Sequence, residues 1–522
     1  MIVGGEIPKK TRVHLIFIKH IFLLSFLSGC LRVDMAIEEL KKPNIVIFYV
    51  DDLGYADLSS YGALGVKTPN VDNLLVNGLK FTDAHSPAAT CTPSRYSLLT
   101  GEYAFRNKAK VLSGDAPLLI DTAKATLPKM LKRAGYTNAV VGKWHLGLGA
   151  GNLDWNINVI PGPLEIGFDY SFLLPATGDR VPTVYLENHK VLNLDRSDPI
   201  WVSYKAPTKK TKALNASDSI RYSSDSDHSQ TVINGVGRIG LMKGGKTAIW
   251  KDEDFPDVFT DKAISFIKKN QENPFFLFFS FHDIHVPRLP NERFQGTSKM
   301  GPRGDAIVQM DWMTGRIMEE LKRLGLEKNT LVIFTSDNGP VLNDGYDDFA
   351  AKMLGEHVPA GEYRGGKYSA FEGGTRVPTI VYWPGFVKPG ESDALISQVD
   401  FYDSLRGLLD VAIKEGSALD SKNLIKALLG RSKTGRKYLL EESFTLSLRT
   451  KDWKYIQPIS SVKEFPKWLC SKDIESGLDT IPQLYNMIID PSEQVNVAMQ
   501  NEEVVRELQY ELERIVNRNK IE

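Results

Sequence analysis

Four short apolar runs, each followed by polar or charged residues, constrain the fold of this chain more than any other feature. Apolar runs of this length are typical of strands buried on both faces, as in a parallel sheet. Helical patterns lie between them, at 127–134 and 307–321. This alternation predicts an α/β fold with a mostly parallel sheet. The runs are 44–50 before Asp51 and Asp52, 139–141 before Lys143 and His145, 275–281 before His282, and 330–335 before Asp337 and Asn338.

The residues that follow these runs are expected at one edge of the sheet, because such sheets bind ligands beyond the carboxyl ends of their strands. Asp51 and Asp52 form one oxygen-rich pair there, and Asp337 and Asn338 form a second. Crowded carboxylates repel one another unless a cation lies between them. Oxygen ligands and the lack of a zinc-type cysteine–histidine spacing favour Ca²⁺, with Mg²⁺ as the alternative. Each pair alone could equally cap a helix or form a turn.

A single cysteine, Cys91, lies in a turn just before a short apolar helix. Thr92 is a good N-cap and Pro93 suits the first helical position. A helix N-terminus attracts anions, and Arg95 adds a permanent positive charge. Cys91 is therefore expected where an oxyanion would bind. The alternative is a buried cysteine that acts only as a small apolar side chain.

Four further side chains are candidates for the same site. Lys143 and His145 would lie on one face of an extended segment, because side chains alternate there. Lys367 lies in a glycine-rich loop, where the backbone can approach a ligand closely. His282 follows a very apolar strand and is expected to point into the site, whereas His285 could equally be structural. Each residue alone also has a purely structural interpretation. Lys143 could be a lysine at a strand end, Lys367 a surface lysine, and the histidines could belong to the core.

The segment Cys91-Thr-Pro-Ser-Arg95, followed by Leu98-Leu-Thr-Gly101, resembles the signature of the type I sulfatases. The resemblance extends over about 44–498. It implies an alkaline-phosphatase-like fold, in which helices sandwich a large, mostly parallel sheet beside a smaller C-terminal α+β subdomain. It also implies that a maturation enzyme converts Cys91 to formylglycine, whose hydrated aldehyde attacks the sulfur of a sulfate monoester.

The resemblance further assigns roles to the candidate residues. The residues that match the family's metal ligands would bind Ca²⁺ together with the formylglycine oxygen at position 91: Asp51, Asp52, Asp337 and Asn338. Those that match its sulfate pocket are Arg95, Lys143, His145, His282 and Lys367. In the implied mechanism the metal and Arg95 hold the sulfate. His282 with Lys367 protonates the leaving group, and His145 removes the proton that releases sulfate.

The substrate is expected to be a sulfated carbohydrate such as a glycosaminoglycan fragment, because the chain looks similar to carbohydrate sulfatases, including those acting on galactose or N-acetylgalactosamine 6-sulfate. Asp179 and Arg180 could bind sugar hydroxyls, or they could form a turn with a surface ion pair. One rival function is hydrolysis of phosphomonoesters, phosphodiesters or phosphonates within the same superfamily. The other is non-catalytic binding of sulfated glycans, against which the full set of candidate catalytic residues argues.

The balance of charge and the first residues bear on location. Lys+Arg and Asp+Glu each number 64, so no overall field favours nucleic acid or an anionic membrane. Residues 1–30 read as a secretory signal, with basic residues before an apolar run. Its end resembles a bacterial lipobox that would lipidate Cys30, the alternative being an ordinary signal peptide. We expect an exported protein, periplasmic or lipid-anchored at the cell envelope, without a structural disulfide.

The remaining chain divides into a catalytic domain at 40–390 and a smaller C-terminal subdomain at 391–522. The polar stretch 195–230 is expected to be a surface excursion near the mouth of the active site. In the subdomain, 448–456 could be an edge strand of a small antiparallel sheet, and 502–519 an amphipathic helix.

Overall fold

Strand β1 (Asn44–Val50) lies inside a ten-stranded sheet and is buried on both faces. Its alternate residues enter two separate cores: Ile47 packs with one, and Phe48 packs with the other. The computed structural model describes residues 1, 42–205, 220–412, 416–472 and 474–518. In spatial order the sheet contains β15 (Gly390–Ser392), β2 (Leu79–Phe81), β14 (Thr379–Tyr382), β13 (Thr330–Ser336), β1, β12 (Phe275–Ser280), β4 (Thr137–Lys143), β5 (Tyr170–Leu174), β6 (Leu186–Glu187) and β7 (Lys190–Val191).

The middle of this sheet is parallel. Strands β13, β1, β12, β4 and β5 run in the same direction, whereas β14 and β6 are antiparallel to their neighbours. All four apolar runs form strands of this parallel part, so the predicted α/β class with a mostly parallel sheet is confirmed. Their carboxyl ends meet at one edge because the strands are parallel neighbours.

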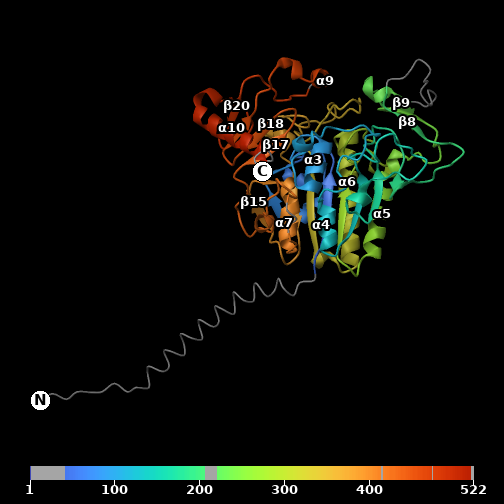
Figure 1. Ribbon diagram of the computed structural model, residues 1–522, viewed down its shortest axis with the longest axis horizontal. Helices are drawn as coiled ribbons and strands as arrows, with labels where there is room; N and C mark the ends of the chain where they lie inside the picture. The colour runs from blue at the N-terminus through green and yellow to red at the C-terminus, as the bar shows by residue number, and fades with distance from the viewer. Residues whose placement is uncertain (2–41, 206–219, 413–415, 473, 519–522) are drawn as a thin grey trace. The chain divides into compact units, whose positions relative to one another are not determined.

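Helices cover both faces of the sheet (Figure 1). One face packs against α3 (Cys91–Thr100), α4 (Leu127–Arg133) and α7 (Phe401–Leu408). The other packs against α2 (Pro69–Val76), α5 (Phe255–Lys269) and α6 (Gly301–Arg323). The predicted helical patterns at 127–134 and 307–321 correspond to α4 and α6.

A separate four-stranded antiparallel sheet follows in the C-terminal part. It contains β17 (Leu439–Glu442), β18 (Leu446–Arg449), β19 (Trp453–Ile456) and β20 (Gln483–Asn486), in that order. Leu508 and Leu512 of α10 (Glu502–Val516) pack on it, as the predicted amphipathic helix requires. The prediction of one edge strand at 448–456 is wrong. The chain turns at Thr450, whose N–H donates to the carbonyl of Trp453 (2.8 Å). The segment therefore forms parts of two strands, β18 and β19, which lie in the middle of the sheet.

Besides several 3₁₀ turns, the described chain contains other short elements. They are the two-stranded sheets β3 (Ala84–His85) with β16 (Ile396–Ser397), β8 (Trp201–Ser203) with β11 (Leu241–Lys243) and β9 (Thr231–Ile233) with β10 (Val236–Arg238), and the helices α8 (Ile425–Leu428) and α9 (Lys467–Ser471). β15 belongs to the large sheet, and the domain boundary at 390 stays a prediction. The signal segment and Cys30 lie outside the described residues. Within the described ranges, no helix is both long and apolar enough to cross a membrane.

Candidate active site

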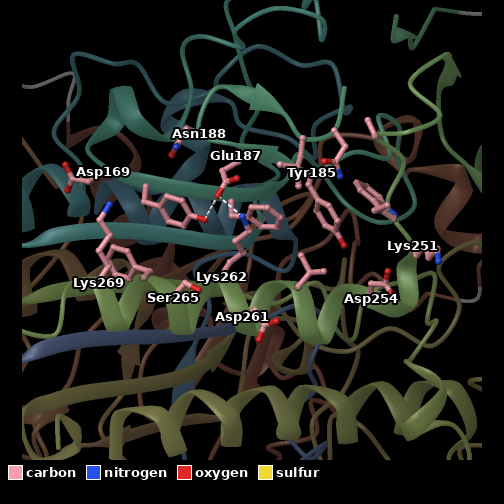
Figure 2. A pocket seen from close by; sticks show the side chains of 18 of the residues that line it. Asp169, Tyr185, Glu187, Asn188, Lys251, Asp254, Asp261, Lys262, Ser265 and Lys269 are labelled. Atoms are coloured by element: carbon pink, nitrogen blue, oxygen red, sulfur yellow. Dashed lines mark hydrogen bonds and ion pairs between the residues drawn. The ribbon is translucent and has the colours of Figure 1, made fainter. Parts of the chain in front are cut away.

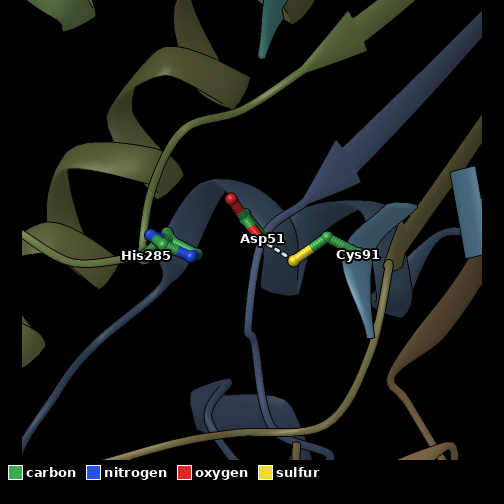
Figure 3. A group of neighbouring side chains, drawn as sticks. All are labelled: Asp51, Cys91 and His285. Atoms are coloured by element: carbon green, nitrogen blue, oxygen red, sulfur yellow. Dashed lines mark hydrogen bonds between the residues drawn. The ribbon is translucent and has the colours of Figure 1, made fainter. Parts of the chain in front are cut away.

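An acidic cluster forms where β1 and β13 end side by side. We use this name for Asp51, Asp52, Asp337 and Asn338, all fully buried. One carboxylate oxygen from each aspartate and the sulfur of Cys91 lie within 4.8 Å of one another. The Cys91 Sγ donates a hydrogen bond to Asp51 Oδ1 at 3.5 Å (Figure 3). The predicted neighbourhood of cysteine and carboxylates is thus present in the structure.

The carboxylates destabilise one another's charge. Burial and the nearby Asp337 raise the pKa of Asp51 well above its ordinary value, and the Lys143 ammonium on Asp51 Oδ2 only partly offsets this. Burial likewise raises the pKa of Asp52, although Lys367 Nζ donates to its Oδ2 at 2.9 Å. A cation placed between these groups would remove the repulsion.

The amide of Asn338 gives an independent test of whether a hard cation fits here. Its Nδ2 donates to Asp52 Oδ1 at 2.8 Å, which fixes the orientation of the amide. Its Oδ1 is buried and has no hydrogen-bond partner among the described residues. A buried oxygen without a partner costs free energy unless a cation or donor reaches it. Three carboxylates and one amide oxygen suit Ca²⁺ or Mg²⁺.

Arg95 supports the acidic cluster from behind. Its Nε and Nη2 donate to Asp337 Oδ2 at 3.0 and 2.7 Å, and its Nη1 donates to Ser280 and to the carbonyl of Lys143. Burial would raise the pKa of Asp337, but this arginine holds it below its ordinary value. Arg95 is fully buried and is not among the residues that line the cavity, so the structure shows it holding Asp337, and its direct contact with sulfate stays a prediction.

Cys91 is the first residue of α3, so the helix begins two residues earlier than the sequence suggested. The N-cap is Thr90, which is extended, and not Thr92. Thr92 lies inside the helix, where its hydroxyl donates to the carbonyl of His145 (2.9 Å). Burial raises the pKa of the Cys91 thiol well above its ordinary value, so the unmodified side chain is a neutral thiol and a poor nucleophile.

His145 presents a free ring nitrogen to the site. The strand β4 ends at Lys143, and His145 takes a left-handed φ of 55°, so the two do not share one extended segment as predicted. Nevertheless Lys143 contacts Asp51, and His145 lines the cavity that contains Cys91. His145 Nε2 donates to the carbonyl of Leu112 (3.0 Å), which leaves Nδ1 as the unprotonated nitrogen, buried and without a partner among the described residues. Burial and Lys143 lower its pKa, so it is neutral and can accept a proton.

His285, and not His282, joins the group around Cys91. Its ring lies with Asp51 and Cys91 in one cluster of possible ligand atoms (Figure 3). Its Nδ1 donates to the carbonyl of Val286 (2.6 Å), and its Nε2 is 3.9 Å from Asp52 Oδ2. His282 instead packs on Phe255.

The predicted placement of His282 in the site is therefore wrong. Its Nε2 faces the backbone of Gly178, where an added Cβ would lie 2.4 Å away, and it has no hydrogen-bond partner among the described residues. Burial lowers the pKa of His282 to about 3, which keeps the ring neutral. The strand β12 ends before both histidines, so the apolar run could not show which one turns toward the sheet edge.

A cavity of about 780 Å³ opens onto these residues. Its wall includes Cys91, His145, Asp179, Arg180, His285 and Lys367. Arg180 Nη1 donates to both carboxylate oxygens of Asp179, at 2.8 and 2.9 Å. Asp179 is buried and Arg180 is partly buried, and both line the cavity, which argues against the alternative of a surface ion pair.

Two cavity residues escaped the sequence analysis. His228 Nε2 lies 3.5 Å from Asp179 Oδ2, and its Nδ1 lies 2.6 Å from Asp225 Oδ1. It belongs to the polar stretch at 195–230, which was expected near the mouth but gave no sign of one histidine turning inward. Asp344 accepts from Lys367 Nζ at 2.9 Å.

A larger hollow of about 940 Å³ lies between α5 and the strands β5 and β6 (Figure 2). It shares no lining residue with the cavity at Cys91. Its central Glu187 accepts hydrogen bonds from Tyr170 and Lys262, both at 2.8 Å. None of the predicted site residues lines it, and these polar groups satisfy one another.

Comparison with known proteins identifies the class to which this fold and site belong. The sulfatase family model matches residues 43–411. The chain belongs to the sulfatase family, whose members are sulfuric ester hydrolases.

Individual relatives agree with this assignment. The chain is 49% identical to an N-acetylgalactosamine-6-O-sulfatase of Bacteroides thetaiotaomicron, over 92% of this chain and 94% of that protein. A solved structure from work on the metabolism of multiple glycosaminoglycans by the same organism is 48% identical. It has a TM-score of 0.88 and covers 91% of this chain and 99% of that one. The phosphonate monoester hydrolase of Agrobacterium radiobacter shares the fold at 18% identity, with a TM-score of 0.57 over 91% and 96% of the two chains. The expected alkaline-phosphatase-like arrangement is thereby confirmed.

Proposed function

We propose that this protein removes 6-O-sulfate groups from N-acetylgalactosamine or galactose units of sulfated glycans, with formylglycine at position 91 and Ca²⁺ in the acidic cluster. The observation that carries the proposal is the buried Cys91 at the start of α3, within reach of three aspartates and open to a cavity. The N-acetylgalactosamine-6-O-sulfatase relative supports the choice of sugar.

The cation and the modified cysteine supply what the unmodified chain lacks. Asp51, Asp52, Asp337 and Asn338 would hold the cation. When bound, the metal neutralises charge on the sulfate oxygens, and the hydrated formylglycine provides the oxygen nucleophile. Arg95 keeps Asp337 charged and in place, and so acts as a positioning residue. This role differs from direct sulfate binding, because four of its five N–H groups are already engaged with Asp337, Ser280 and the carbonyl of Lys143.

The remaining residues manage protons and charge. His145 Nδ1, neutral and without a partner, is suited to accept a proton from the modified side chain. Lys143 and Lys367 place two ammonium groups beside the cluster, where they favour an anionic substrate. His285 lies on the cavity wall, and its Nε2 would protonate the leaving sugar oxygen in place of His282 once it has itself taken up a proton. Burial and Lys367 hold the pKa of His285 well below its ordinary value, so the negative charge of the bound sulfate must favour that protonation. Asp179 and Arg180, supported by His228, would bind sugar hydroxyls on the same wall.

An exported location suits such a substrate, because sulfated glycans are extracellular polymers. The signal segment at 1–30 and lipidation of Cys30 remain predictions from the sequence. Maturation requires a formylglycine-generating enzyme acting on the segment around Cys91.

Mass spectrometry of the peptide across Cys91, together with sulfate release from sugar sulfates, tests the proposal. The peptide is expected at the mass of the aldehyde, and N-acetylgalactosamine 6-sulfate should be hydrolysed faster than its 4-sulfate isomer or any phosphate ester. The matched variant Cys91→Ala should fold normally and release no sulfate. An unmodified thiol in an active preparation, or phosphate esters as the better substrates, would contradict the proposal.

A further inference from the structure

Three aromatic rings meet on the wall of the cavity that contains Cys91. Tyr368 and Trp468 are in edge contact with ring centroids 4.9 Å apart, and Phe444 lies 6.1 Å from Trp468 and 6.4 Å from Tyr368. All three line the cavity. Phe444 lies in the turn between β17 and β18 and Trp468 lies on α9, so two rings come from the C-terminal part. We call these three residues the aromatic platform.

Two of the three residues of the platform, Phe444 and Trp468, are exposed to solvent, whereas Tyr368 is partly buried. Phe444 keeps 41% of its surface and Trp468 keeps 38% in contact with solvent. Large apolar side chains clustered in a groove mark ligand-binding sites, because a ligand can bury them. The flat apolar face of a pyranose ring, formed by its C–H groups, matches an aromatic ring of this kind.

The platform is joined to the acidic cluster by a short chain of hydrogen bonds. The Tyr368 hydroxyl donates to Asp344 Oδ2 at 3.2 Å. Lys367 Nζ donates to Asp344 and to Asp52, each at 2.9 Å. The Ser443 hydroxyl donates to the carbonyl of Tyr368 (2.8 Å) and ties the turn of Phe444 to this chain. A ligand on the platform is thus next to the reacting centre, and not in a remote site.

The charges around the platform suit an anionic glycan. Exposed Lys108 and Lys110 line the same cavity, and Lys472 Nζ is 5.7 Å from the centre of the Trp468 ring. Burial raises the pKa of Glu442, a carboxyl on the same wall, to about 8, so it does not add a repulsive charge at neutral pH. Asp227 and Glu464 also line this cavity, and Lys472 pairs with Asp225 and Asp344. Lys108 and Lys110 are therefore the cations that would meet sulfate or uronate groups on a neighbouring sugar.

We propose that the aromatic platform binds the sugar unit linked to the sulfated one, so that the enzyme recognises at least a disaccharide. This inference rests on the proposed function, because it takes Cys91 as the point where the scissile sulfate lies. The sulfated unit would occupy the part of the cavity between Cys91 and Arg180. Its neighbour would stack on Phe444 and Trp468.

The test compares kcat/KM for a 6-sulfated monosaccharide with kcat/KM for disaccharides that extend it on either side. We expect the wild-type protein to prefer at least one disaccharide. Phe444→Ala and Trp468→Ala should each lower the ratio of disaccharide to monosaccharide kcat/KM by about tenfold, the usual cost of truncating an aromatic anchor. Trp201→Ala and Phe349→Ala are the matched controls, since these exposed rings lie outside the cavity, and they should leave the ratio unchanged.

Binding of the desulfated disaccharides, measured by calorimetry, separates this inference from the proposed function. If the wild-type protein hydrolyses none of the sulfated sugars, the proposed function fails, and weaker binding by Phe444→Ala and Trp468→Ala still supports the platform. Equal losses on monosaccharide and disaccharide, no loss on either, or unchanged binding of the desulfated disaccharides would overturn it.

Discussion

Two buried groups of carboxylates in this protein share their chemistry and differ in their surroundings. One is the acidic cluster at the ends of β1 and β13. The other, which we call the interface cluster, joins the segments at 83–85 and 372 to the C-terminal sheet. It consists of Asp83, His85, Glu372, Glu441, Arg449 and Lys454.

Glu372 and Asp52 illustrate the contrast. Both are fully buried, and burial raises the pKa of each. Around Glu372, Arg449 and Lys454 outweigh burial and hold the pKa well below its ordinary value. Around Asp52, Lys367 is shared with Asp344 and Asp337 adds repulsion, so the pKa stays raised. At Glu372 the neighbouring cations outweigh burial, whereas Lys143 and Lys367 do not outweigh it at Asp51 and Asp52, and the acidic cluster opens onto a cavity. That difference, and not the number of carboxylates, marks the functional site.

The largest effect should come from isosteric removal of one charge in the acidic cluster. Asp52→Asn is expected to lower kcat/KM by at least about 10²–10³-fold, because a ligand of the cation and a partner of Lys367 is lost. Its stability in metal-free buffer should match or exceed that of the wild type, since Lys367 keeps Asp344 and a repulsive charge is gone. Sulfate release and chemical denaturation measure the two effects. If Asp52→Asn were strongly destabilised and kept its activity, the two clusters would not differ in the way described.

The same change in the interface cluster should have the opposite outcome. Glu372→Gln leaves Arg449 and Lys454 buried with reduced compensation, so the free energy of unfolding should fall by ~3–5 kcal/mol. The folded fraction should keep its turnover, because Glu372 does not line the cavity. Urea denaturation measures the free energy of unfolding. The rate of sulfate release is divided by the concentration of folded active sites, so that activity is compared per folded molecule.

Two histidine variants would test which histidine near the acidic cluster takes part in the reaction. His285→Ala should reduce kcat by about 10²-fold, as expected when a positioned proton donor is lost. His282→Ala removes a side chain that packs against Phe255 and Gly178, and should affect stability more than kcat. Steady-state kinetics beside thermal unfolding distinguishes them. A larger kcat loss in His282→Ala would restore the assignment suggested by the sequence.

Addition of Ca²⁺ would test which cluster is incomplete. A ligand that binds only the folded state at 100 times its Kd stabilises that state by about 2.7 kcal/mol. We expect a concentration-dependent rise in melting temperature for the wild type and Glu372→Gln, and none for Asp52→Asn. Mg²⁺ in parallel would identify the preferred ion. A rise that persists in Asp52→Asn would place the ion elsewhere.

The smallest effect concerns acid pH. Because the folded pKa of Glu372 is depressed, its contribution to stability is complete above the unfolded value of about 4.3 and is lost as pH falls through the folded pKa. The stability difference between wild type and Glu372→Gln should therefore shrink below about pH 4. Denaturation curves of both proteins at about pH 7, 5 and 3, which lie above and below the unfolded pKa, would show whether this difference shrinks. A constant difference would mean that Glu372 does not act through its charge.

The sequence predicted the sheet and the acidic cluster because both follow from local patterns. An apolar run predicts a buried strand, and parallel strands bring their ends together, so Asp51 and Asp337 had to meet. The choice between His282 and His285, by contrast, depends on how the chain turns after β12. The engagement of Arg95 with Asp337 depends on contacts across 242 residues of sequence. His228 approaches Asp179 from a polar loop without any periodic pattern. Such tertiary contacts leave no local signal.

Two residues of the site, Asp52 and His145, hold left-handed backbone angles, with φ of 62° and 55°. Glycine adopts this conformation without the cost of ~1–2 kcal/mol that a side chain with a Cβ incurs. Replacement of either by glycine would relax the backbone while deleting a side chain of the proposed site. The enzyme thus sacrifices some robustness at these two positions in return for turnover. A search for thermostable variants that scored folding alone would be drawn to them and would select inactive proteins.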